Sequence, residues 1–303
     1  MTLVWASGYS GNPGKVKLKA SGTSVNLKVT NSQDYAPKYV RYLINTEAVT
    51  PGTVDYNFGI LAGTVDVDWG DGTSNTGVNS NTTHTYSSPG YYVVTISQNG
   101  TNTFRPDIGL QEISVEHESV EGGGFWDDNM GNVAQDASNL KRWGSVNLGN
   151  VTNFGSAWRN CSSLTSFPLI DTSSGTTFGS AWRGCSSLTN FPLIDTSTGT
   201  NFGNTWRNCS SLTDFPANFF DSWTATPANG CFSQAWDGCS SLTATSVENI
   251  LNSIDTSGQS APSGVNKNIT IDYDTGTGTP SVSTAVTNLK SRGWNIILNG
   301  VAQ

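Results

Sequence analysis

Residues 153–170 read NFGSAWRNCSSLTSFPLI, and residues 177–194 repeat this stretch as TFGSAWRGCSSLTNFPLI after a step of 24 positions. A third copy, NFGNTWRNCSSLTDFP, occupies residues 201–216, and a fourth, CFSQAWDGCSSLTATS, begins at Cys231 after a six-residue insertion. A fixed period of this length indicates a solenoid in which each repeat forms one stacked unit. The sequence therefore predicts a repeat array at residues 129–245.

The apolar positions predict how one repeat folds. Phe154 and Trp158 are four residues apart, with Cys161 three further on, which favours a helical or 3₁₀ turn. A short strand is predicted at the L-x-x-L-x-L positions Leu164, Phe167 and Leu169, followed by a turn at residues 171–173. We expect a narrow parallel sheet, because the prolines at 168, 192 and 216 each remove a backbone donor.

The two ends of the array differ from its middle, as capping units must. Upstream, a degenerate copy places apolar side chains at the repeat positions, namely Met130, Ala134, Ala137, Leu140 and Trp143. Downstream, residues 246–303 are predicted to form an α/β cap. Its expected elements are a helix and a Gly-Trp strand, carried by residues 247–251 and 285–294.

Four of the five cysteines, Cys161, Cys185, Cys209 and Cys239, recur once per repeat. That pattern indicates a small buried residue rather than a disulfide framework. The histidines, His84 and His117, lie far from them in sequence, so no zinc site is expected. We predict no metal and no cofactor.

The segment A-W-x-[GN]-C-S-S-L-T, at residues 157–165 and 181–189, resembles the leucine-rich repeats of BspA-type bacterial surface proteins. Similar repeats, followed by a helix and a Gly-Trp strand, are typical of tail-associated phage proteins. The resemblance implies a leucine-rich-repeat solenoid with a binding role.

A different motif precedes the repeats. Residues 63–96 read GTVDVDWGDGTSNTGVNSNTTHTYSSPGYYVVTI, with strand-like alternation at Val65, Val67 and Trp69 and again from Tyr91. The W-G-D-G, H-x-Y and P-G-x-Y elements resemble PKD-type β-sandwich domains, which implies a spacer or binding module at residues 53–108. Residues 109–128 are predicted to be a linker. Strands expected at 15–19 and 25–29, within residues 1–52, either complete the sandwich or form an attachment segment.

Composition and charge narrow the functional classes. The chain has 38 Ser, 37 Thr, 30 Asn and 33 Gly among 303 residues, yet also 10 Trp, 9 Tyr and 12 Phe, which supply a core. These residues favour a mostly β, ordered protein. The net charge of −8 disfavours a nucleic-acid partner, and no apolar run is long enough to span a membrane.

Two sets of side chains are candidate ligand-binding residues. Arg159, Arg183 and Arg207 are predicted to form a column of like charges, neutralised either by neighbouring carboxylates and carbonyls or by an acidic glycan or phosphate. Ser166, Asn190 and Asp214 are predicted to face outward, where they would suit a hydroxyl-rich ligand or simply be solvated. The repeat tryptophans are expected in the core rather than in a sugar-stacking ladder.

Other chemical motifs have simpler interpretations. Asp274-Thr275-Gly276 matches the D-T-G of aspartic proteases, but its Gly/Thr-rich context predicts a turn. Asp68 and Asp71 lack the oxygen-ligand density of a calcium loop, so a turn is favoured there too. No paired acids suggest an enzyme.

The sequence thus favours a non-enzymatic phage virion surface protein, assembled in the host cytoplasm, that mediates adhesion to the host. Its N-terminal β region would contact other virion proteins, and its repeats a host glycan or protein. The N-terminal residues lack a signal-peptide pattern, which favours this hypothesis over a bacterial adhesin. A capsid decoration or head fibre protein and a bacterial cell-surface adhesin remain alternatives. Homo-oligomerisation is compatible with each of them.

Overall fold

The computed structural model describes residues 39–46, 53–56, 64–79, 82–99, 116–123, 130–144, 148 and 151–303. In this part of the chain, ten strands outnumber two α-helices, so the predicted mostly β class is confirmed. The strands predicted at 15–19 and 25–29 lie outside the described residues.

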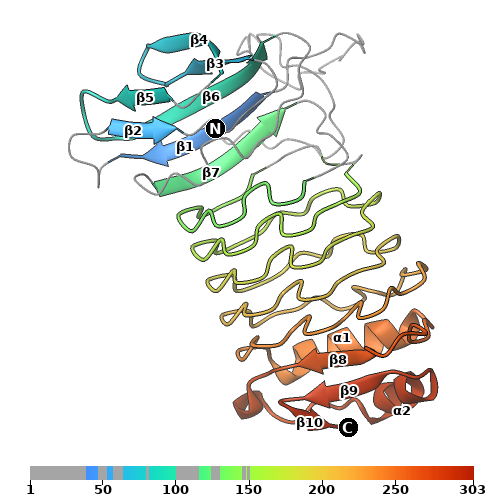
Figure 1. Ribbon diagram of the computed structural model, residues 1–303. Coiled ribbons are helices and arrows are strands. Elements are labelled where there is room, and N and C mark those ends of the chain that lie inside the picture. The colour runs from blue at the N-terminus through green and yellow to red at the C-terminus, as the bar shows by residue number, and fades with distance from the viewer. Residues whose placement is uncertain are drawn as a thin grey trace, which may run out of the picture.

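The N-terminal strands form two sheets (Figure 1). The larger one is antiparallel, in the order β4-β3-β6-β1-β7, and the smaller one pairs β2 with β5. Their bounds are β1 Tyr39–Asn45, β2 Thr53–Tyr56, β3 Thr64–Asp68, β4 Ser74–Val78, β5 Thr82–Thr85, β6 Tyr91–Asn99 and β7 Glu116–Gly123.

Alternation of buried and more exposed side chains explains why β3 and β6 are strands. Val65 and Val67 of β3 and Val94 and Ile96 of β6 are buried, which confirms the two strands predicted around the W-G-D-G motif. The flanking strands come from further away in the sequence. Strand β1, between β6 and β7, lies within residues 1–52, and edge strand β7 lies in the segment 109–128 that was predicted to be a linker.

The repeats form stacked coils whose backbones are hydrogen-bonded to one another (Figure 1). The N–H of Phe154 donates to the carbonyl of Thr177 and that of Trp158 to Ala181, both at 2.8 Å, and equivalent bonds join the other coils. Each coil therefore depends on its neighbour for backbone partners, as in a solenoid.

The predicted conformation within a coil is wrong on two counts. Ser156 and Asn160 have φ of 56° and 60°, so the segment around Trp158 is a series of turns with left-handed residues and not a helix. Where the strand was expected, only isolated parallel bridges form, among them Asn190 with Asp214. The prolines that follow, such as Pro192, have no N–H with which to extend such a bridge.

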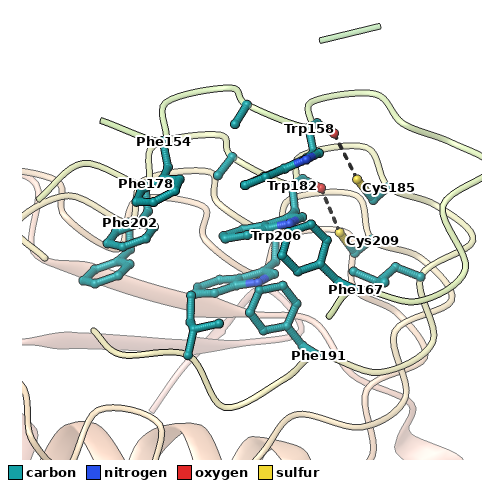
Figure 2. Close-up of a cluster of buried hydrophobic side chains, with 14 of the residues drawn as sticks. Phe154, Trp158, Phe167, Phe178, Trp182, Cys185, Phe191, Phe202, Trp206 and Cys209 are labelled. Carbon is teal, nitrogen blue, oxygen red and sulfur yellow. Dashed lines mark hydrogen bonds between the residues drawn. The ribbon is translucent and has the colours of Figure 1, made fainter. Parts of the chain in front are cut away.

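Aromatic ladders fill the inside of the coils (Figure 2). The four repeat tryptophans and their cysteines are fully buried, as predicted, and the degenerate copy from Met130 to Trp143 contributes its own buried coil. One apolar position was wrongly predicted: Leu169 is 70% exposed and Leu193 is 51% exposed, whereas the next residues, Ile170 and Ile194, are buried.

The C-terminal cap contains α1 (Ala244–Thr256), a 3₁₀ turn (Thr275–Thr277), α2 (Ser283–Ser291) and a sheet in the order β10-β9-β8. The strands are β8 (Asn268–Ile271), β9 (Asn295–Leu298) and β10 (Val301–Ala302). The predicted α/β composition of the cap is confirmed: residues 247–251 lie in α1, and residues 285–291 lie in α2, with β9 directly after Gly293–Trp294. A parallel bridge between Ile271 and Trp236 joins the cap to the last coil.

Helix α1 covers an edge of the array with polar side chains that replace a further coil. The Ser246 hydroxyl donates to the Thr213 carbonyl at 2.9 Å and accepts the Phe215 N–H at 3.0 Å. About one turn later, the Asn249 amide donates to the Phe215 carbonyl. About one further turn along, the Ser253 hydroxyl accepts the Phe220 N–H. These bonds satisfy backbone groups of residues 213–220, in the third repeat and the insertion that follows it.

Candidate ligand-binding surface

The arginine column consists of Arg159, Arg183 and Arg207, each directly following a buried tryptophan. Burial of the indole fixes the backbone of each coil at this point, and the next side chain is half-buried at the surface. Because the coils are stacked, residues at equivalent positions of successive coils are neighbours. The three arginines therefore repeat at the spacing of the coils.

Arg207, at one end of the column, is held by its neighbours. Its Nε lies 2.9 Å from Oδ2 of Asp237, and its Nη1 donates to Oε1 of Gln234 at 3.1 Å. Asn204 Oδ1 lies 3.5 Å from the same Nη1. The predicted neutralisation by a neighbouring carboxylate is confirmed for this arginine.

Arg159, at the other end, lies near Asp136 of the preceding coil. Hydrogen bonds from Gln135 and Asn160 lower the pKa of the Asp136 carboxyl, and the positive charge of Arg159 lowers it further. The Nε of Arg159 is nevertheless buried and has no hydrogen-bond partner in the described part of the chain. This arginine is near a carboxylate but is incompletely satisfied.

Arg183, in the middle, has neither a hydrogen bond nor an ion pair from its side chain to any described residue. The equivalent positions on either side are arginines rather than acids. The column therefore places three guanidinium groups against two carboxylates, one at each end.

A second surface, the polar column, consists of Ser166, Asn190 and Asp214. All three residues are exposed, as predicted, and a parallel bridge holds Asn190 beside Asp214. Leu169 and Leu193, three residues further along each coil, are exposed as well and were missed. The signal was present in the sequence, because Leu and Ile follow Pro168 and Pro192, and alternation allows only one of each pair to face inward.

The other acidic motifs form turns and ion pairs. Asp274 Oδ1 accepts the Gly276 N–H at 2.8 Å, so the D-T-G segment is a turn, as predicted. Asp68 and Asp71 likewise accept N–H groups two residues further on, from Gly70 and Thr73. Among the described residues, no three His, Cys, Asp or Glu side chains are grouped closely enough to hold a metal ion.

The W-G-D-G motif organises a small aromatic cluster. The His84 ring stacks on Trp69 with centroids 4.6 Å apart, and its Nε2 lies 2.8 Å from Oδ2 of Asp71. The Tyr86 hydroxyl donates to the Trp69 carbonyl at 2.9 Å. Burial acts to raise the pKa of Asp71, but the hydrogen bonds from Thr73 and His84 outweigh it and lower this pKa. These contacts hold the turn.

Comparison of the chain with protein-family models, with curated proteins and with solved structures finds no match. The leucine-rich-repeat and PKD resemblances therefore remain predictions, and the candidate surface rests on its geometry. Neither described helix has the length and apolar character needed to cross a membrane.

Proposed function

We propose that this protein is a non-enzymatic surface component of a phage virion, tail-associated or in another appendage, that adheres to the host cell through its coils. The same proposal includes a leucine-rich-repeat class for the array and a PKD-like sandwich for the N-terminal sheets. The repeat motif, the W-G-D-G motif and the Gly-Trp strand of the cap support these assignments.

The observation that carries the proposal is the fixed repetition of exposed polar groups on a rigid core. The rings of Phe154, Phe178 and Phe202 stack at 5.2 and 5.3 Å, so packed aromatic rings join each coil to the next. Side chains on the outside of the coils repeat with the same period. A surface that is ordered before binding loses little conformational entropy when a ligand arrives, which favours recognition of a repetitive ligand.

The polar column suits a hydroxyl-rich ligand of this kind. Ser166, Asn190 and Asp214 offer a hydroxyl, an amide and a carboxylate on successive coils, so two coils present both donors and acceptors and the third presents acceptors alone. The exposed leucines, Leu169 and Leu193, add apolar contacts beside them. A host glycan has both hydroxyl groups and apolar faces, which fits this combination.

The N-terminal sheets and the C-terminal cap are consistent with a protein that presents its coils to the host. Strands β1 and β7 extend the N-terminal sheet well beyond the W-G-D-G motif, which gives the chain a separate β module for contacting other virion proteins. Helix α1 closes an edge of the coils, so that edge is not free to pair with other strands.

The test is immunogold electron microscopy of the source culture with antiserum to this protein, combined with binding of the purified protein to host cells. Label on virion tails or appendages and saturable cell binding are expected. Label over phage heads would replace the proposal with capsid decoration. Label on cell envelopes with bare particles would replace it with a bacterial adhesin.

A further inference from the structure

The arginine column is electrostatically incomplete at its centre. Arg207 has Asp237 at 2.9 Å, and Arg159 has the Asp136 carboxylate near it, but Arg183 has no carboxylate partner among the described residues. Three positive charges at the coil spacing repel one another, and two negative charges leave one positive charge in excess.

A comparison within the molecule shows why Arg183 differs from Arg207. The groups that hold Arg207 come from its own coil, at Asn204, and from the next coil, at Gln234 and Asp237. The equivalent positions around Arg183 are Ser180 in its own coil, and Asn204 and Arg207 in the next. The carboxylate that would complete the site is thus replaced by another guanidinium.

A second observation concerns Arg159. Its Nε is buried and lacks a hydrogen-bond partner in the described part of the chain. The Nε of Arg207 is also buried without a hydrogen bond, but it has the Asp237 carboxylate 2.9 Å away, and Arg159 has no ion pair of that kind with a described residue. The Arg159 guanidinium occupies the position next to Arg183 in the column. Two guanidinium groups without an ion pair to a described carboxylate therefore lie on successive coils.

We propose that Arg183, together with Arg159, binds the carboxylate of an acidic polysaccharide. A guanidinium presents paired N–H donors that match the two oxygens of a carboxylate, and a bidentate pair of this kind is short and strong. One carboxylate supplies one negative charge, which equals the excess in the column. The proposal rests on the proposed function and specifies the ligand class as a uronic-acid type of glycan.

The experiment measures binding of purified full-length protein to oligogalacturonate by calorimetry, with neutral dextran oligomers as the comparison ligand. The variant is Arg183→Gln, which keeps a polar side chain but removes the charge and the guanidinium. The matched control is Lys290→Gln, which removes one positive charge from an exposed position on α2.

Binding of oligogalacturonate but not dextran is expected for the wild type and for Lys290→Gln. Arg183→Gln should weaken it about tenfold or more, the effect typical of losing a hydrogen bond to a charged group. Affinity should also fall as sodium chloride screens the charges. Circular dichroism and the urea midpoint establish that the variant is folded.

Equal affinity of wild type and Arg183→Gln, or no binding of oligogalacturonate by the wild type, would overturn the carboxylate site. Host-cell binding separates this result from failure of the proposed function. Cells that bind the wild type and Arg183→Gln equally would leave adhesion intact and exclude the arginine column, whereas cells that bind neither protein would reject adhesion itself.

Discussion

The indole of Trp182 lies on that of Trp158, with ring centroids 5.1 Å apart and planes inclined by 11° (Figure 2). The ring of Phe167 contacts both indoles edge to face, at 4.6 and 5.1 Å. The indole Nε1 atoms are buried without a conventional hydrogen bond. The negative face of a phenyl ring is a weak acceptor for such N–H groups. A core that places Phe beside each Trp therefore suits indole N–H groups that have no stronger acceptor.

Replacing Trp182 by Ala should therefore remove contacts to both neighbouring coils at once. We expect a loss of about 3–5 kcal/mol in the free energy of unfolding, as for other large aromatic truncations in a core. Urea denaturation followed by circular dichroism measures it. Trp182→Phe should retain more stability than Trp182→Ala, and equal losses would show that ring stacking does not hold the coils together.

The cysteine ladder gives a prediction about reactivity. The Cys185 thiol donates to the Trp158 carbonyl at 3.1 Å, and the Cys209 thiol donates to the Trp182 carbonyl at the same distance. Burial raises the pKa of both thiols well above its usual value and that of Cys231 to about 12. Because the thiolate is the reactive form, labelling should be slow in the native protein.

All five thiols should react with a disulfide reagent only as fast as the chain unfolds, at pH 7 and at pH 9 alike. The control is the same protein in urea, where five thiols should react promptly. A thiol that reacts rapidly in native protein at pH 9 would contradict the buried position of that cysteine.

A third prediction concerns the contact between Gly184 and Asn160. Gly184 has φ of +76°, and a Cβ built on it would lie 2.5 Å from Oδ1 of Asn160. Gly184→Ala should destabilise the protein by about 1 kcal/mol for the left-handed backbone alone, with a further cost from the Asn160 contact.

A double-mutant cycle separates the two costs. In an Asn160→Ala background the contact is absent, so Gly184→Ala should cost less than in the wild type but should still be destabilising. Urea midpoints of the four proteins provide the comparison. Strict additivity would show that Asn160 does not crowd this position.

The sequence predicts the core of the coils well for a physical reason. Residues that recur every 24 positions and are apolar, such as Trp158 and Cys161, must be buried whatever the coil conformation. The conformation itself was predicted wrongly because the spacing of Phe154 and Trp158 fits a helix equally well. The left-handed Ser156 is stable through hydrogen bonds to the next coil, and these bonds cannot be seen in a local window.

The candidate ligand-binding surface was also predicted only in part. Periodicity was enough to align Arg159, Arg183 and Arg207 and to place Ser166 outside. It could not distinguish the three arginines, because that difference depends on which side chains of the next coil reach each guanidinium. The replacement of Arg by Asp237 in the fourth repeat was the available signal, and only the structure shows it forming an ion pair.

The acid sensitivity of the N-terminal sheet should depend on Asp71. Its pKa in the folded protein lies below the ordinary value of 3.8, because hydrogen bonds from Thr73 and His84 outweigh the effect of burial. A lowered folded pKa means that the charged carboxylate stabilises the fold above about pH 4 and that this stability is lost as the pH falls through the folded value.

Asp71→Asn should therefore lower stability at pH 6 and reduce the further loss between pH 4 and pH 2. Asp214→Asn, which removes an exposed carboxylate of the polar column, is the matched control and should change the pH dependence less. Urea midpoints across this pH range provide the measurement. Superimposable pH profiles for wild type and Asp71→Asn would exclude the role of Asp71.

The capping action of α1 can be tested at Ser253. Its hydroxyl accepts the Phe220 N–H at 2.6 Å and donates to Oδ1 of Asp221 at 2.7 Å, in a buried position between helix and coil. Ser253→Ala leaves the Phe220 N–H without its partner, so we expect a loss of about 1–3 kcal/mol. Asn252→Ala, at the exposed neighbouring position of the same helix, should cost little. If the two variants unfold at the same urea concentration, α1 covers the coils through apolar contacts alone and the polar replacement of a missing coil is wrong.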